Sequence, residues 1–398
     1  MQPCQTNTHG FTANQEHEHA SSYFALLPKL KGLGNKWLGL TLFAKCAHKT
    51  LTRTTRKDLE GTLKVGIKLQ ENVSIDLIDA KILKMLLKES RTPFTEIAKE
   101  CKISVGAVRV RYNHLKKVGV INGEIMLVNP YSLGYICVGN LGINTLAENH
   151  KEVIEFLKKK TTLTTLYYSW ESWGKYNIGL LVSKKSTEEW AVVLRFLEAT
   201  PHIKRVDPLI WFAPVGMDHP ENLEIKPLEN KKQENTIEQP PITIDTEQIK
   251  IDEVDRQIAK ILIHSSRTSF RNIAKQLNIS TKKVIRRYKK LRENLLIHST
   301  ITLDLKKIGY NAIATIFVKG ERSKMQEIAN KILQMPNIIV FIRLIGSYDL
   351  LAIAALEDFG SLARLQKEIH MIKGIEQVDF SINEPFSTWP ANAFAPLL

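Results

Sequence analysis

A stretch of sequence that occurs twice constrains this chain more than any other feature. Residues 75–121 return as residues 251–297, and about 20 of the 47 aligned positions are identical. One folding unit therefore recurs within the 398-residue chain. The chemistry of this unit determines what the chain can do.

Each copy predicts three helices with a tight turn before the third. In the first copy, apolar residues such as Ile78 and Leu86 recur at helical spacing. A short second helix is predicted to begin near Pro93, since proline lacks an N–H that the first helical turn would leave unpaired anyway. Ser104 is a good N-cap for the third helix, and Ser280 takes the same place in the second copy.

A short helix, a turn and a capped basic helix form the helix-turn-helix pattern, whose last helix enters the DNA major groove. One such pattern is weak evidence, because packed helical hairpins with one basic face are common. Two copies that keep the serine, a valine, an arginine and a leucine at the same spacing favour DNA binding. The alternative is that the basic residues form a solvated face beside an acidic partner domain. So dense a run of basic residues makes this alternative less favoured, because the charges repel each other unless an anion lies nearby.

The two third helices differ in charge. The candidate DNA-contacting residues of the second helix are Ser280, Lys282, Lys283, Arg286, Arg287, Lys289 and Lys290. Those of the first helix are Ser104, Arg109, Arg111, His114 and Lys116, but its first turn, Val105-Gly106-Ala107, has few hydrogen bonds to give. We expect the second helix to dominate affinity and to bind in a strongly salt-dependent way. The DNA site should then be an imperfect palindrome.

The sequence after each copy also repeats. Its apolar pattern predicts strand 136–146, helix 148–160, strands 163–170 and 176–183, helix 187–199 and strand 203–213, then strand 311–319, helix 323–335, strands 338–345 and 349–356, helix 358–372 and strand 375–383. This βαββαβ order is the ferredoxin-like arrangement, with helices on one face of an antiparallel sheet. The face of each sheet that carries no helices must also be covered, which implies that the sheets pair with each other.

The chain resembles the Lrp/AsnC regulators of transcription, in which a helix-turn-helix domain precedes a ferredoxin-like domain called RAM. The matching residues are Ser104, Val108, Arg111-Tyr112, Leu115, Gly119-Val120-Ile121 and Leu133-Gly134-Tyr135, then Ser280, Val284, Arg287, Leu291, Ile308-Gly309-Tyr310 and Gly346-Ser347-Tyr348-Asp349. The resemblance covers roughly residues 74–215 and 250–388. It implies an α+β fold in which two winged or helix-turn-helix domains alternate with two ferredoxin-like RAM domains. One departure is Leu295 in place of a glycine, so Asn294 is expected to take the left-handed cap.

The resemblance also implies an amino-acid effector and assembly through the RAM domains. The candidate effector-binding residues are Gly346, Tyr348 and Asp349, with Gly174, Tyr176 and Asn177 in the first copy. Asn177 replaces the aspartate there. In the alternative interpretation the glycine only permits a turn, the tyrosine packs on the sheet and the aspartate caps a strand. Because family members dimerise through the sheet face, the two copies are expected to form a pseudo-dimer within the chain and homo-oligomers beyond it.

These patterns divide the chain into seven parts. The predicted parts are a basic, disordered extension (1–72), a helix-turn-helix domain (74–124), a RAM-like domain (125–215), a mobile linker (216–249), a second helix-turn-helix domain (250–300), a second RAM-like domain (301–388) and a tail (389–398). The extension could be a DNA-contacting arm, or translation could begin near Leu63 or Val65.

Composition agrees with a polyanionic partner. Lys and Arg number 56 against 41 Asp and Glu, which gives a formal net charge of +15 and suits double-stranded DNA. The four cysteines lack paired metal-binding spacing and are expected to be reduced thiols in a cytoplasmic protein. No stretch reaches the length of a membrane span, and no motif calls for a cofactor or a metal.

Two functions from other classes remain open. Siroheme decarboxylases share this tandem architecture, and their active-site loop carries a histidine beside a Tyr-Asn pair. The equivalent stretch here is Trp173-Gly174-Lys175-Tyr176-Asn177, which lacks the histidine that a proton donor would require. An amino-acid sensor without DNA binding would have acidic or shortened third helices, and the second helix shows the opposite.

Overall fold

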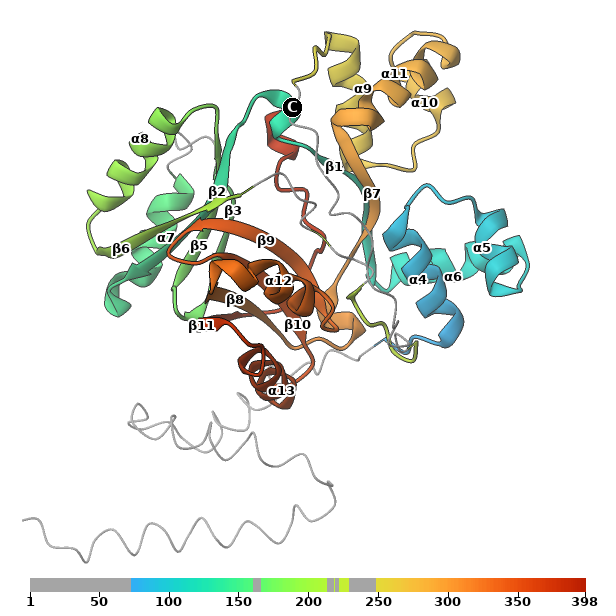
Figure 1. Ribbon diagram of the computed structural model, residues 1–398. Coiled ribbons are helices and arrows are strands. Elements are labelled where there is room, and N and C mark those ends of the chain that lie inside the picture. Colours follow the sequence, from blue (N-terminus) through green and yellow to red (C-terminus); the bar gives the residue numbers. More distant parts are fainter. Residues whose placement is uncertain (1–72, 160–165, 213–217, 219–221, 229–247) are drawn as a thin grey trace, which may run out of the picture. The chain divides into compact units, whose positions relative to one another are not determined.

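The first repeat folds into three helices, α4 (Leu77–Lys88), α5 (Phe94–Cys101) and α6 (Val105–Lys117) (Figure 1). The computed structural model describes residues 73–159, 166–212, 218, 222–228 and 248–398. The side chain of Asp76 caps α4 by accepting the N–H groups of Ile78 and Asp79. Ser104 caps α6 by accepting the N–H of Ala107, as its position predicted.

The second repeat folds in the same way, into α9 (Glu253–His264), α10 (Phe270–Gln276) and α11 (Thr281–Asn294). Asp252 caps α9, and Ser280 caps α11. The expected left-handed cap at Asn294 was wrong. Residue Leu295 follows α11 with φ −92° and ψ −45°, so the backbone continues in the right-handed region directly into a strand. A glycine is therefore not needed at this helix end.

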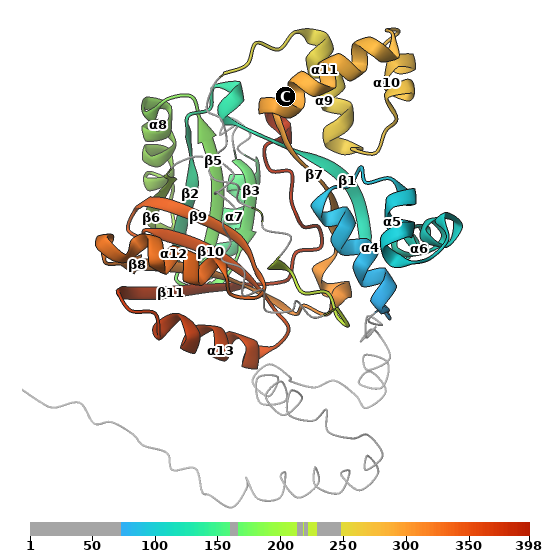
Figure 2. The ribbon, with the colours of Figure 1, turned by 45° about the vertical axis from the view of Figure 1, so that its right-hand side comes forward.

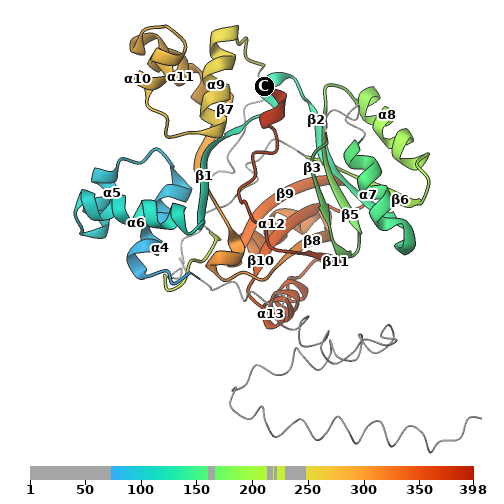
Figure 3. The same cartoon turned by 180° about the vertical axis from the view of Figure 1, so that it is seen from behind.

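Strands β1 (Ile121–Val128) and β7 (Leu296–Leu303) follow the two helical units and pair with each other, antiparallel. Each helical unit packs on the strand of the other repeat, because α4 contacts β7 and α9 contacts β1. The apolar core of the first unit includes Ile301 and Leu303 of β7. That of the second includes Met126 and Val128 of β1. Figure 3 shows the helical units beside this strand pair.

Residues 137–211 form a sheet with two helices. Its elements are β2 (Cys137–Thr145), α7 (His150–Lys159), β3 (Leu166–Glu171), β4 (Trp173–Gly174), β5 (Ile178–Lys184), α8 (Thr187–Glu198) and β6 (Ile203–Trp211). Residues of α7 and α8, such as Val153 and Trp190, are buried with Leu141 and Leu180 of the strands. One face of this sheet is thus covered by its own helices.

The same order returns in residues 312–383. The elements are β8 (Ala312–Gly320), α12 (Met325–Leu333), β9 (Ile338–Gly346), β10 (Leu350–Leu356), α13 (Phe359–His370) and β11 (Ile375–Asn383). Short 3-10 turns lie at Tyr131–Leu133, Ala147–Asn149, Leu305–Ile308, Arg322–Lys324 and Ala395–Leu397. Helices α12 and α13 pack on one face of the strands. The predicted mixed α+β fold with ferredoxin-like element order is confirmed here.

The two sets of strands join into one sheet of order β3-β5-β2-β6-β9-β10-β8-β11-β4. One seam pairs β6 with β9 (Figure 2). The other pairs β11 with β4. The faces without helices share one core, in which Tyr176 and Leu209 of the first set lie with Phe317 and Leu351 of the second. Each set therefore covers the open face of the other within one chain.

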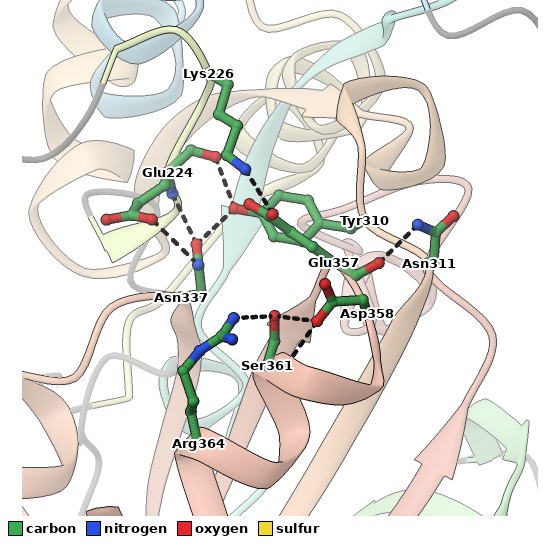
Figure 4. Close-up of polar contacts among 9 residues, drawn as sticks. All are labelled: Glu224, Lys226, Tyr310, Asn311, Asn337, Glu357, Asp358, Ser361 and Arg364. Carbon is green, nitrogen blue, oxygen red and sulfur yellow. Dashed lines mark hydrogen bonds and ion pairs between the residues drawn. The ribbon is translucent and has the colours of Figure 1, made fainter. Parts of the chain in front are cut away.

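The sequence predicted a mobile linker between the two repeats, and this was wrong for residues 222–228. Within the predicted linker 216–249, residues 222–228 dock on the second set of strands and helices, and the apolar side chains of Leu223 and Ile225 are fully buried. The Tyr310 hydroxyl donates to the carbonyl oxygen of Glu224 at 2.7 Å, and Lys226 pairs with Glu357 at 2.6 Å (Figure 4). Two apolar anchors in a polar, proline-containing stretch were too sparse a pattern to predict this.

Two further features complete the fold. The tail is anchored, since Trp389 bonds to the backbone of Leu303 and Phe394 packs against Trp211. No helix in the described part of the chain is long and apolar enough to cross a membrane. The predicted extension 1–72 and most of the predicted linker lie outside the described residues.

Candidate functional site

The exposed face of α11 carries a row of basic side chains. Lys282, Arg286 and Lys289 are exposed, and Lys283 is half-buried. Among the described residues, none of these four forms an ion pair, and no acidic residue lies in the first turn of the helix. Lys282 and Lys283 lie in the first turn, at the helix N-terminus, which favours anions. This face can therefore hold the phosphates of a nucleic acid.

The matching face of α6 is much less basic. Arg109 and His114 are exposed, but Val105 and Val110 are exposed too, the latter by 70%. Lys116 is partly neutralised, because its ammonium lies 2.7 Å from Glu124. Burial would raise the pKa of Glu124, but hydrogen bonds from Lys116 and Tyr112 outweigh burial and lower it. The expected charge difference between the two helices is thus present on their exposed faces.

Two of the predicted DNA-contacting arginines form ion pairs within their own helical unit. Arg111 of α6 lies 2.6 Å from Asp76 and 2.9 Å from Asp79. Arg287 of α11 lies 2.6 Å from Asp252 and 2.7 Å from Asp255. Each arginine thereby ties the third helix to the capped start of the first. Carboxylates about 30 residues away in sequence draw both side chains inward, so a contact of Arg111 or Arg287 with DNA stays a prediction.

Lys290 belongs to the same internal network. Its ammonium lies 3.0 Å from Asp255 and 2.7 Å from the carbonyl oxygen of Lys250, although the side chain remains half-exposed. Burial would raise the pKa of Asp255, but hydrogen bonds from Arg287 and Lys290 outweigh it and hold that pKa below the usual range. The charge of Lys290 is therefore partly neutralised by Asp255, so Lys290 should attract an anionic ligand less strongly than Lys289 does.

The predicted effector loops lie at the two seams of the sheet. Gly346 (φ +148°) pairs with Leu209, and a side chain there would collide with the carbonyl oxygen of Pro208. Gly174 (φ +125°) pairs with Ser381 and would collide in the same way with that of Phe380. Both glycines are needed for a close approach between the halves of the chain.

The two tyrosines of these loops are buried and bonded internally. The Tyr348 hydroxyl donates to Asp379 at 2.6 Å, and the Tyr176 hydroxyl donates to Asp207 at 2.7 Å. Burial, followed by these hydrogen bonds, raises the pKa of both tyrosines. Phe317 lies between them, with ring centroids 5.0 Å from Tyr176 and 5.4 Å from Tyr348. Neither hydroxyl is available to an effector in this arrangement.

Asp349 and Asn177 have the same structural task. The carboxylate of Asp349 accepts the N–H of Gly320 at 3.0 Å, at the end of β8. The amide oxygen of Asn177 accepts the N–H of Thr145, also at 3.0 Å, at the end of β2. These bonds favour the structural alternative for Gly346, Tyr348, Asp349 and their counterparts, whose contact with an effector stays a prediction. One acceptor oxygen is all that the site requires.

Sequence reasoning missed the contact between the two helical units. It is made by Arg91 and Arg267, which lie in the turns after α4 and α9. The only signal was the identical tripeptide Ser-Arg-Thr in both repeats, which a turn alone does not demand.

Three family models match the chain. A winged helix-turn-helix DNA-binding model matches residues 75–122, an AsnC-type helix-turn-helix domain matches 251–292, and an Lrp/AsnC ligand binding domain matches 311–383. Among solved structures, siroheme decarboxylase NirDL has a TM-score of 0.54 at 16% identity, over 80% of this chain and 96% of that one. At that identity the likeness shows the fold alone.

Relatives of similar sequence are transcriptional regulators. Regulatory protein AsnC of Haemophilus influenzae is 31% identical over 156 residues, which are 39% of this chain and 99% of the relative. An uncharacterised HTH-type transcriptional regulator of Pyrococcus horikoshii is 33% identical over 33% of this chain and 89% of its own length. LrpA of the same organism is 45% identical over 24% of this chain and 67% of its own. With its helix-turn-helix units and ligand-binding domain, the chain belongs to the Lrp/AsnC family of DNA-binding transcriptional regulators.

Proposed function

We propose that this regulator is a tandem duplication that performs in one chain what a dimer of single units performs. Its domains would be helix-turn-helix units at 74–124 and 250–300 and RAM-like units at 125–215 and 301–388, joined by 216–249 and ended by 389–398. Relatives covered along 89% and 99% of their length match only about a third of this chain, which supports this division. The pairing of β1 with β7 and the two sheet seams would supply the contacts of such a pseudo-dimer.

The pseudo-dimer would bind double-stranded DNA with two unequal halves. The observation that carries this proposal is the exposed basic row of α11, Lys282, Arg286 and Lys289, beside the weakly basic face of α6. Ser104 and Ser280 would act as helix caps, and Arg109 and His114 would add contacts on the weaker side. An imperfectly palindromic DNA site fits the charge difference between the two helices. We place this regulator in the cytoplasm.

Fluorescence anisotropy with DNA fragments selected from the genome tests the proposal. Replacing Arg286 or Lys289 with Ala should weaken binding by about 1–3 kcal/mol where the residue reads a base, or lower the salt slope by about 1 where it contacts a phosphate. Lys367→Ala on exposed α13 is the matched control and should change neither quantity. Equal losses in all three variants would mean that α11 is not the binding surface.

A small-molecule effector remains part of the proposal. The match of residues 311–383 to a ligand-binding domain supports it. Because the seam residues are used internally, we expect the effector to bind elsewhere on this domain. Calorimetry with a panel of amino acids tests this, and further self-association can be followed in the same samples. No heat from any of them would remove amino acids as effectors.

A siroheme decarboxylase is the second candidate, favoured by the shared fold of NirDL. The loop 173–177 lacks a histidine, but His150 lies near this loop. The His150 ring bonds to the Thr145 hydroxyl, and the Thr145 N–H donates to the amide oxygen of Asn177 in the loop. Incubation with siroheme and analysis of the tetrapyrrole products would decide between the two. We expect no decarboxylation, because the loop 173–177 lacks the histidine that a proton donor would require.

A further inference from the structure

The turns after α4 and α9 reach into each other. They carry the same tripeptide, Ser90-Arg91-Thr92 and Ser266-Arg267-Thr268. The Arg91 guanidinium donates to the carbonyl oxygens of Ser266 and Thr268, the latter at 3.0 Å. The Arg267 guanidinium donates in return to those of Ser90 and Thr92, the latter at 3.2 Å. Each helical unit thus donates two arginine hydrogen bonds to the backbone of the other.

Each arginine also lies against the aromatic pair of the opposite unit. Arg91 lies over Phe270, 4.5 Å from the ring centroid, and 5.4 Å from that of Tyr288. Arg267 lies over Phe94 at 4.5 Å and 5.7 Å from Tyr112. Tyr112 belongs to α6 and Tyr288 to α11. Both candidate recognition helices are therefore contacted from their inner side by an arginine of the other unit.

A buried serine cluster holds the two turns together. The hydroxyl of Ser90 bonds to that of Ser266 at 2.5 Å and to that of Ser299 on β7. The backbone N–H of Ser90 donates to the carbonyl oxygen of Ser299 at 3.0 Å, and that of Ser266 donates to the carbonyl oxygen of Glu124 on β1 at 2.9 Å. Ser90, Ser266 and Ser299 are fully buried. The turns that carry the two arginines are thus held in place by buried hydrogen bonds.

We propose that Arg91 and Arg267 are positioning residues that hold α6 and α11 at one separation and orientation, and so set the spacing of the DNA half-sites that one chain accepts. The inference rests on the proposed binding of DNA by both units. A planar guanidinium can bond two carbonyl oxygens and stack on a ring at once, which lysine cannot do. The contact is therefore stiff in both distance and angle.

DNA duplexes with two half-sites and a spacer varied in steps of one base pair test this directly. The half-sites come from genomic fragments that the full-length wild type selects. Wild type should prefer one spacing, because recognition helices fixed to each other match the groove only at a set separation. In the Arg91→Lys/Arg267→Lys variant, the preference for that spacing over one shifted by about half a helical turn should fall about tenfold. Its affinity for an isolated half-site should stay unchanged.

Arg271→Lys, an exposed arginine on α10, is the matched control and should keep the wild-type profile. Lysine keeps the charge and the aliphatic stem, so the variants should fold, and each single variant should broaden the profile by less than the double one. A folded double variant with the wild-type spacing profile would overturn the inference while leaving DNA binding intact. A wild type that binds no genomic half-site would instead overturn the proposed function.

Discussion

Arg286 and Arg287 are neighbours on α11 with opposite surroundings. Arg286 is exposed, whereas the side chain of Arg287 is 18% exposed and contacts Asp255, which is 1% exposed. Removing a partner from a buried charge costs more than removing an exposed charge. The same residue type in adjacent positions therefore has a structural role in one place and a proposed binding role in the other.

Arg287→Met should lower the free energy of unfolding by about 1–3 kcal/mol, because Asp255 keeps only Lys290 as a charged partner. Arg286→Met, the matched control, should change it by less than about 0.5 kcal/mol. Urea denaturation measures both. If the two variants unfolded at the same urea concentration, the brace would contribute nothing to stability.

Asp349→Asn should be tolerated in stability, since Asn177 performs the same bond in the first half of the chain. The change in unfolding free energy should stay within about 0.5 kcal/mol. Asp349→Ala removes the acceptor of the Gly320 N–H and should cost about 1–3 kcal/mol. A large loss in the Asn variant would show that the charge of Asp349 has a task beyond this hydrogen bond.

Helices α6 and α11 share a cap and a buried stripe but differ in their exposed faces. In α11, Arg286 stands six residues after the Ser280 cap, and in α6 the residue six after Ser104 is Val110. The residues that fix the packing of each helix thus differ from those that we propose to bind DNA. The exposed face of α6 can therefore be made more basic without changing the packing of the helix.

Val110→Arg should strengthen DNA binding and steepen the salt dependence by about one unit of slope, because it adds one cation at the exposed face of α6. Val192→Arg on exposed α8 adds the same charge elsewhere and should leave the slope unchanged. Anisotropy titrations over a range of salt give both slopes. Equal effects of the two substitutions would point to net charge instead of to the position of α6.

The periodic elements could be predicted from the sequence, and the contacts between distant elements could not. Helical and strand patterns located α7 and α8 and strands β8 to β11 within a few residues. Strands β1 and β7 were missed, since each is stabilised by the other and by a helix from the opposite repeat. The exposed basic row followed from helical spacing, but the inward direction of Arg111 and Arg287 depends on carboxylates placed by tertiary structure.

At the scale of the whole molecule, the open faces of the two sheets are complementary in size. The cross-strand pair Gly142–Gly179 lies in the first sheet, and the pair Phe317–Leu351 lies in the second. All four residues line one small cavity between the sheets. A side chain at Gly142 would collide with the Tyr176 ring. Gly142 thus leaves room for the Tyr176 ring of its own half, which packs on Phe317 of the other half.

Phe317→Ala should cost about 3–5 kcal/mol, because it leaves a cavity at the centre of this contact. Phe359→Ala, at an 84% exposed position, is the matched control and should cost less than about 0.5 kcal/mol. Hydrogen exchange should rise together in β2, β5, β8 and β10 of the Phe317 variant. Faster exchange confined to β8 and β10 would mean that the halves are stable separately.

The most direct test is to sequence the genomic DNA that the purified full-length chain selects, and to measure how many chains occupy each selected site. We predict enrichment of sites with two unequal halves about one helical turn apart, occupied by a single chain. Substitution of Arg286 should reduce selection of the stronger half. Recovery of DNA with no enriched sequence, or of sites that need two chains for two half-sites, would contradict the pseudo-dimeric regulator.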